Sequence, residues 1–219
     1  MISARTIAVF RLSPARATML AAGIVVLALA WAGPLPALAM TRFAAHMTMH
    51  LAVVAIAAPL IALAIAGSRL DPTARSLQTG AGVLAFPVLA AFAEFAVVWG
   101  AHVPAVHDMK RLEPTWAMIE QLAFLSVGVA LWLSAFGGRG RERGARAALG
   151  IGALLFTAMH MTLLGALLAL APRPLYEACL GLADQEIGGV MMLAAGLVYL
   201  VGGVVLVARI LGDGEDPSP

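Results

Sequence analysis

Residues 41–66 read TRFAAHMTMHLAVVAIAAPLIALAIA. No charged residue follows Arg42 in this stretch, and about 20 apolar residues are enough for a helix to cross the hydrocarbon core of a bilayer. His46 and His50 lie inside it at positions i and i+4, so both imidazoles project from the same face of a helix. A histidine at membrane depth is costly unless it is paired, hydrated or bound to a ligand. The stretch therefore predicts a membrane helix that carries a polar site.

The composition of the whole chain supports a membrane protein. Of the 219 residues, 62% are hydrophobic and only 12% are charged, against about 25% charged in soluble domains. The apolar segments are too long for the strands of a β-barrel. We therefore predict an all-α, polytopic transmembrane bundle in the lipid bilayer, with a basic amino terminus (1–16), a six-helix membrane domain (17–209) and an acidic, disordered tail (210–219). The expected spans are 17–38, 41–66, 81–101, 115–136, 147–171 and 185–209.

The distribution of Lys and Arg predicts the orientation of the bundle. The amino terminus, the second and fourth loops and the end of the last span hold ten of these residues, and the other side holds four. The positive-inside rule then places both termini in the cytoplasm. In an alternative interpretation, the first segment is a secretory signal cleaved after Ala37-Leu38-Ala39, which would leave five spans. We expect an uncleaved helix, because the apolar run is long for a signal. The net charge of +2 comes from these loops and gives no indication of nucleic-acid binding.

In this orientation all five histidines fall in the outer half of the bundle, which predicts one polar site open to the extracytoplasmic face. Imidazole and thioether ligands suit copper, particularly the reduced ion. The expected metal ligands are His46, His50 and His160, with Met49 or Met161 as additional soft ligands. His102 is expected at the mouth of the site, and His107 in the solvated loop beyond it. The single cysteine, Cys179, excludes an internal disulfide and a cysteine-only metal site.

Several of these polar residues have a structural interpretation beside the functional one. The pair of His46 and His50 could bridge helices without any ligand. Glu94 is either a helix-bridging carboxylate or part of a proton or cation path. Glu120 either supports the metal ligands or is a charge at the start of a helix. Asp184 is a helix cap or a ligand.

Three strings in the chain resemble those of a known family. They are FAAHMTMHLAVVAIAAPLIALA (43–64), VVWGAHVPAVHD (97–108) and HMTLLGALLALAPRPLYEACLGLADQEIGGVMM (160–192). Together they resemble, in order, the signature segments of the multi-span CtaG membrane family of bacterial cytochrome c oxidase assembly factors. This family is distinct from the single-span copper chaperone of the same name.

The resemblance implies a place in the bacterial inner membrane and a role in maturing a haem-copper oxidase. It implies copper delivery to the catalytic subunit, with a periplasmic copper donor as a further partner. It places the family's histidines at His46, His50, His102 and His160, and its acidic pair at Asp184 with Gln185. The chain departs from the family pattern at Glu120-Gln121, where relatives have Glu-His, and it lacks an additional span found in longer relatives.

Three other functions remain as alternatives. The first is a haem b electron carrier with His50 and His160 as axial ligands. The second is a copper or proton-coupled transporter that uses Glu94, and the third is a structural accessory subunit. Nothing in the sequence resembles a nucleophile with its base, a phosphate-binding loop or a pair of catalytic carboxylates, so we expect no enzymatic activity.

Overall fold

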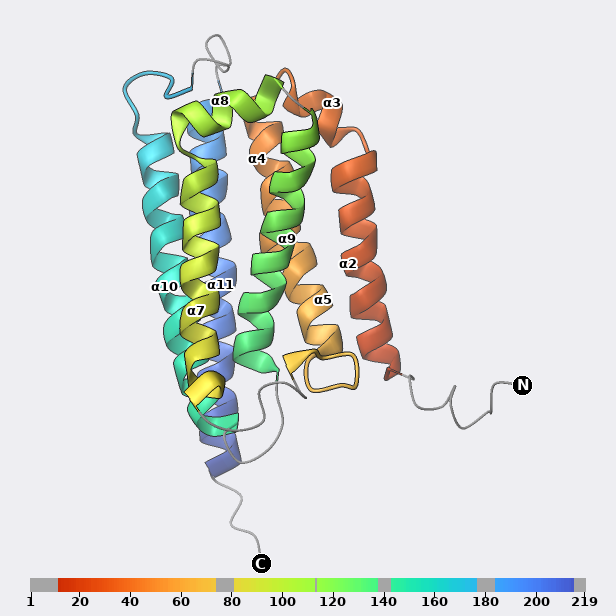
Figure 1. The fold of residues 1–219 in the computed structure, drawn as a ribbon. Coiled ribbons are helices and arrows are strands. Elements are labelled where there is room, and N and C mark those ends of the chain that lie inside the picture. Colours follow the sequence, from red (N-terminus) through yellow and green to blue (C-terminus); the bar gives the residue numbers. More distant parts are fainter. Residues whose placement is uncertain (1–11, 74–80, 113, 138–142, 177–183, 215–219) are drawn as a thin grey trace, which may run out of the picture.

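The computed structural model describes residues 12–73, 81–112, 114–137, 143–176 and 184–214. This part of the chain is helical and contains no strand (Figure 1), which confirms the predicted all-α class. Cys179 and the last five residues of the predicted tail lie outside the described residues. The helices are α2 (Pro14–Ala32), α3 (Leu35–Ala39), α4 (Phe43–Leu51), the π-helix η1 (Ala52–Ala57), α5 (Ala58–Ile65), α7 (Ala81–Ala101), α8 (Pro104–Leu112), α9 (Pro114–Phe136), α10 (Arg143–Ala169) and α11 (Gln185–Gly214).

Six helices in the described residues are long and apolar enough to cross a membrane, in agreement with the predicted bundle. The first one differs from the expected 17–38. It begins at Pro14, directly after the Ser13 cap, and ends at Ala32. Gly33 and Pro34 then separate it from α3. Proline has no backbone N–H to donate and disfavours helical geometry in the residue before it, so the helix ends ahead of Pro34. The last helix runs to Gly214, so the first five residues of the expected tail are helical.

The second span changes its helical geometry half-way along. α4, η1 and α5 form one continuous rod, and the π-turns of η1 come directly before Pro59. Proline has no N–H to donate to the carbonyl four residues earlier, so the backbone bonding pattern must change near it. The carbonyl of Val54 in η1 accepts a hydrogen bond of 3.1 Å from the Tyr199 hydroxyl of α11. A neighbouring helix thus satisfies a polar backbone group in the middle of the apolar bundle.

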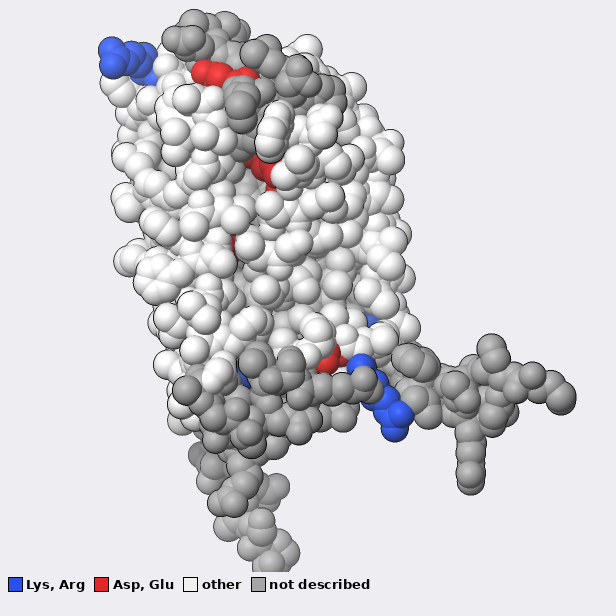
Figure 2. Space-filling view, in the orientation of Figure 1, with Lys and Arg blue, Asp and Glu red and all other residues white. Residues whose placement is uncertain are grey.

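The arrangement leaves the polar groups at the two ends and inside the bundle. Figure 2 shows one face of the molecule, on which Lys and Arg lie toward the ends and the surface between is almost entirely uncharged. α2 begins and α11 ends at the same end of the bundle (Figure 1), so the first and last spans share a side. Which side faces the cytoplasm stays a prediction. α8 and α3 lie across the opposite end, next to the start of α4.

α10 and α11 approach one another through glycine. A Cβ atom added to Gly189 would lie 2.4 Å from the backbone nitrogen of Ala169 and 2.8 Å from the carbonyl oxygen of Gly165. Backbone atoms cannot move aside as a flexible side chain can. A Cβ atom on Gly203, further along α11, would meet nothing closer than 3.7 Å. Small residues at such positions let membrane helices pack closely.

We expect Gly189→Ala to lower the free energy of unfolding by about 1–3 kcal/mol, because the added methyl group overpacks a backbone contact. Gly203→Ala is the matched control on the same helix, and it should be neutral or stabilising by up to about 1 kcal/mol. Unfolding in mixed micelles with increasing SDS measures both. Equal stability of the two variants would contradict the close approach at Gly189.

Candidate metal centre

An acidic residue that is distant in the sequence caps the first turn of α4. The Asp184 carboxylate accepts hydrogen bonds from the backbone N–H groups of Phe43 (3.0 Å) and Ala44 (3.1 Å). These N–H groups have no partner within their own helix, and a negative charge at this end is favourable. Gly188, one turn into α11, leaves room for Phe43 and Met47. Asp184 therefore acts as a cap, as one sequence interpretation expected, but for α4 instead of its own helix.

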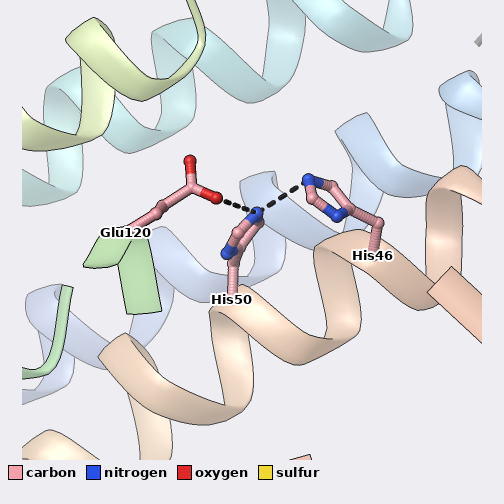
Figure 3. A group of neighbouring side chains, drawn as sticks. All are labelled: His46, His50 and Glu120. Carbon is pink, nitrogen blue, oxygen red and sulfur yellow. Dashed lines mark hydrogen bonds and ion pairs between the residues drawn. The ribbon is translucent and has the colours of Figure 1, made fainter. Parts of the chain in front are cut away.

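Capping sets the position of two buried histidines in α4. The Nε2 atoms of His46 and His50 lie 2.8 Å apart, a hydrogen-bond distance. The Nε2 atom of His50 also lies 3.8 Å from Oε2 of Glu120, which α9 contributes. One ligand atom from each of these three residues lies within 4.8 Å of the others, and all three residues are buried. Figure 3 shows the two imidazoles projecting from one helix toward the carboxylate of a second. We call His46, His50 and Glu120 the triad.

The second nitrogen of His50 also has a partner. Nε2 of Gln121 lies 2.7 Å from Nδ1 of His50, and Oε1 of the same amide accepts a bond of 3.3 Å from the Trp31 indole N–H. Gln121 is buried beside Glu120 in α9. Its role was not predicted from the sequence. The only sequence signal was the departure from the family pattern at this position.

Two further histidines flank the triad. The ring centroid of His102 lies 6.3 Å from that of His50, and its Nδ1–H donates to the carbonyl of Val98 at 2.7 Å. His107, in α8, meets His46 edge-on at 5.0 Å and stacks on Tyr176 at 4.0 Å. His107 is only 3% exposed. The expectation that it would be solvated was wrong, because α8 folds back over this end of the bundle.

The structure places His160 in a different polar group. Its Nε2 atom bonds Oε2 of Glu94 at 2.8 Å, between α10 and α7, and Thr157 reaches the same oxygen at 3.5 Å. The rings of Phe95 and Phe156 enclose it at 5.2 and 5.3 Å. The expected centre of His46, His50 and His160 is thus not brought together, and Glu120 stands where His160 was expected. Glu94 bridges helices, one of its two sequence interpretations.

The two methionines expected as ligands are part of the apolar core. Met49 is 9% exposed and follows His46 by three residues, and Met161 is fully buried next to His160. Methionine commonly fills irregular gaps between apolar side chains. Packing alone therefore accounts for their burial, and ligation by either sulfur stays a prediction.

The chain matches the model of the family described as cytochrome c oxidase caa3 assembly factor (Caa3_CtaG) over residues 3–212, nearly its whole length. The chain belongs to this family. The resemblance in the sequence is thereby confirmed. Comparisons with curated proteins and with solved structures found no match.

Membership of the Caa3_CtaG family supports a role in cytochrome c oxidase assembly, with the oxidase as partner. It also indicates a non-catalytic role for this multi-pass membrane protein. Within this family member, the triad is the group of described His, Asp and Glu residues compact enough to hold a metal ion. Two nitrogens bound to one ion at about 2.0–2.1 Å in tetrahedral geometry lie about 3.3 Å apart. The 2.8 Å between His46 and His50 is shorter, so the rings must separate slightly to admit an ion.

Removing the Asp184 carboxylate tests how α4 is held. We expect Asp184→Ala to destabilise the protein by about 1–2 kcal/mol, the usual cost of losing a helix cap. Glu186→Gln is the matched control, because Glu186 is an exposed acidic residue in the first turn of α11. Thermal unfolding of the purified proteins in detergent measures the difference. A wild-type melting temperature for Asp184→Ala would show that the cap contributes nothing.

Proposed function

We propose that this Caa3_CtaG family member binds copper through His46, His50 and Glu120 and assists its delivery to the oxidase. The observation that carries the proposal is the buried triad, in which three potential ligand atoms from two helices lie within 4.8 Å of one another. Burying a carboxylate and two imidazoles in an apolar bundle is costly unless they are paired or bind a common ligand. Assembly of cytochrome c oxidase supplies a reason for that ligand to be a metal.

The ligands of the triad suit copper that is held and then released. Imidazole is a good ligand for copper in both redox states, and a single carboxylate adds charge for a divalent ion. Three ligands leave open positions on the ion. An incoming ligand from the oxidase can occupy such a position before the ion dissociates from the triad. Met49, three residues from His46, is the sulfur ligand that α4 itself could add.

The position of the triad favours handover at one end of the bundle. His46 lies about 5 Å and His50 about 10 Å from the start of α4, given a rise of 1.5 Å per residue. His102 directly follows α7 at that end and His107 lies in α8 across it, and both neighbour the triad, so we assign them a role in guiding the ion to or from His50 and His46.

The opposite end argues against a transport path. There the buried Arg146 donates to the carbonyls of Ser134 (2.9 Å) and Leu133 (2.8 Å) and to the Thr73 hydroxyl (3.0 Å). Asp71 in turn accepts from the backbone N–H and hydroxyl of Thr73. These groups join the loop after α5 to α9 and α10. They serve the packing of that end, which supports handover over transport.

A haem group would use His50 and His160 as axial ligands in the alternative function. In the structure these side chains belong to separate groups, one bonded to His46 and Gln121 and the other to Glu94. We therefore propose copper, and haem remains an outcome that an absorption spectrum of the purified protein would reveal by its Soret band.

The double substitution His46→Ala with His50→Ala should remove copper from the purified protein, because it deletes two of the three ligands. In cells that carry only this variant, the oxidase should contain less copper and its normal complement of haem. Metal analysis of both purified proteins measures this outcome. Normal copper in the oxidase would end the proposal.

The choice of third ligand can be tested separately. We expect Glu120→Gln to weaken copper binding by about tenfold or more, because the neutral amide is a poor ligand. His160→Gln should leave the affinity near that of the wild type, since His160 bonds Glu94 outside the triad. Competition with a coloured copper chelator ranks the two variants. The reverse ranking would restore the three-histidine site predicted from the sequence.

A further inference from the structure

Three side chains from three helices form a hydrogen-bonded chain that ends at the triad. Trp31 at the end of α2 bonds Gln121 of α9 at 3.3 Å, and Gln121 bonds His50 of α4 at 2.7 Å. An indole N–H can only donate. It must therefore face the amide oxygen of Gln121, and the amide NH2 group must face His50. The direction of the whole chain follows from the chemistry of Trp31.

This direction determines which nitrogen of His50 carries the proton. Because the amide donates to Nδ1, that nitrogen must accept, and the neutral imidazole then has its proton on Nε2. The Nε2–H group is positioned to donate to Nε2 of His46 at 2.8 Å. Both members of the pair are thus neutral, and the proton on His50 occupies the atom that points into the triad.

That arrangement opposes metal binding. An ion bound at Nε2 of His50 needs the lone pair of that nitrogen, so the proton of the neutral ring must lie on Nδ1. Nδ1–H would then face the NH2 group of Gln121, and two donors cannot bond. A half turn of the amide would offer Oε1 to His50, but it would also direct NH2 at the Trp31 N–H and break that bond.

We propose that Gln121 and Trp31 form a switch that couples the loading of the triad to α2. In the metal-free protein the amide bonds Trp31 and keeps the proton on Nε2 of His50. Metal binding turns the amide and releases Trp31. This inference rests on the proposed metal site and concerns its regulation. Gln121 is a positioning residue, because it acts on the metal through His50.

The position of α2 explains how a partner could recognise the state of such a switch. α2 is the least enclosed of the spans, since 11% of the residues in its apolar stretch are buried inside the bundle. Among the described residues, α2 is joined to another helix by one hydrogen bond between side chains, that from Trp31 to Gln121. Releasing it frees the end of α2 that lies beside the triad. The loaded and empty proteins would therefore differ at an exposed helix.

Copper(I) affinity gives the first test, by anaerobic competition with a coloured chelator. Trp31→Phe removes the donor that holds the amide, so it should bind copper(I) about three- to tenfold more tightly than the wild type, the equivalent of one net hydrogen bond. Trp116→Phe is the matched control, because Trp116 lies exposed on α9 and should leave the affinity unchanged. In a Gln121→Leu background, Trp31→Phe should have no further effect. Unchanged or weaker binding by Trp31→Phe, or the same gain without Gln121, would overturn the switch.

A metal-free measurement separates this inference from the proposed function. In protein with ¹⁵N-labelled histidine, NMR should show the His50 proton on Nε2 in the wild type. Gln121→Glu should move it to Nδ1, since a carboxylate accepts from Trp31 and His50 together. A wild-type proton on Nδ1, or one that stays on Nε2 in Gln121→Glu, would overturn the inference whether or not the protein binds copper. Failure of the wild type to bind copper, with the tautomers as expected, would overturn the proposed function instead.

Discussion

The imidazole of His50 has a polar partner on each of its two nitrogens, and three spans meet through this ring. α4 supplies His50 and His46, α9 supplies Gln121 and Glu120, and α2 supplies Trp31. An unpaired polar group in the apolar interior of a membrane bundle is costly, so these bonds favour one rotation of each helix about its axis. The Asp184 cap determines where α4 begins and therefore the depth of the ring.

The buried polar groups of the bundle are divided by location. The triad and its flanking histidines lie near the end covered by α8. The pair of Glu94 and His160 joins α7 to α10, and Arg146 closes the opposite end. Each group crosses between helices that are otherwise held by small residues and apolar side chains. A buried polar site near one end, with the other end occupied by structural bonds, suits the proposed transfer of an ion to a partner.

Membership of a family of cytochrome c oxidase assembly factors and the geometry of the triad support one another. The family gives the process, and the triad gives a place where a metal could be held during it. Gln121 adds a further feature to the site. Its amide has a fixed direction because the indole beyond it can only donate. The proposed handover of copper would benefit from such a constraint, because a site that binds its ion too tightly cannot give it up.

The sequence by itself determined the membrane class, the six spans and the shared face of His46 and His50. Apolar length and the i to i+4 spacing are local properties of the chain, and the long apolar helices must follow from them in a bilayer. Tertiary structure alone decided that Glu120 joins these histidines while His160 bonds Glu94, that Asp184 caps α4, and that His107 and Gln121 belong to the site. Those contacts depend on the rotation and register of one helix against another. Packing between helices sets both, and periodicity within a single helix carries no information about them.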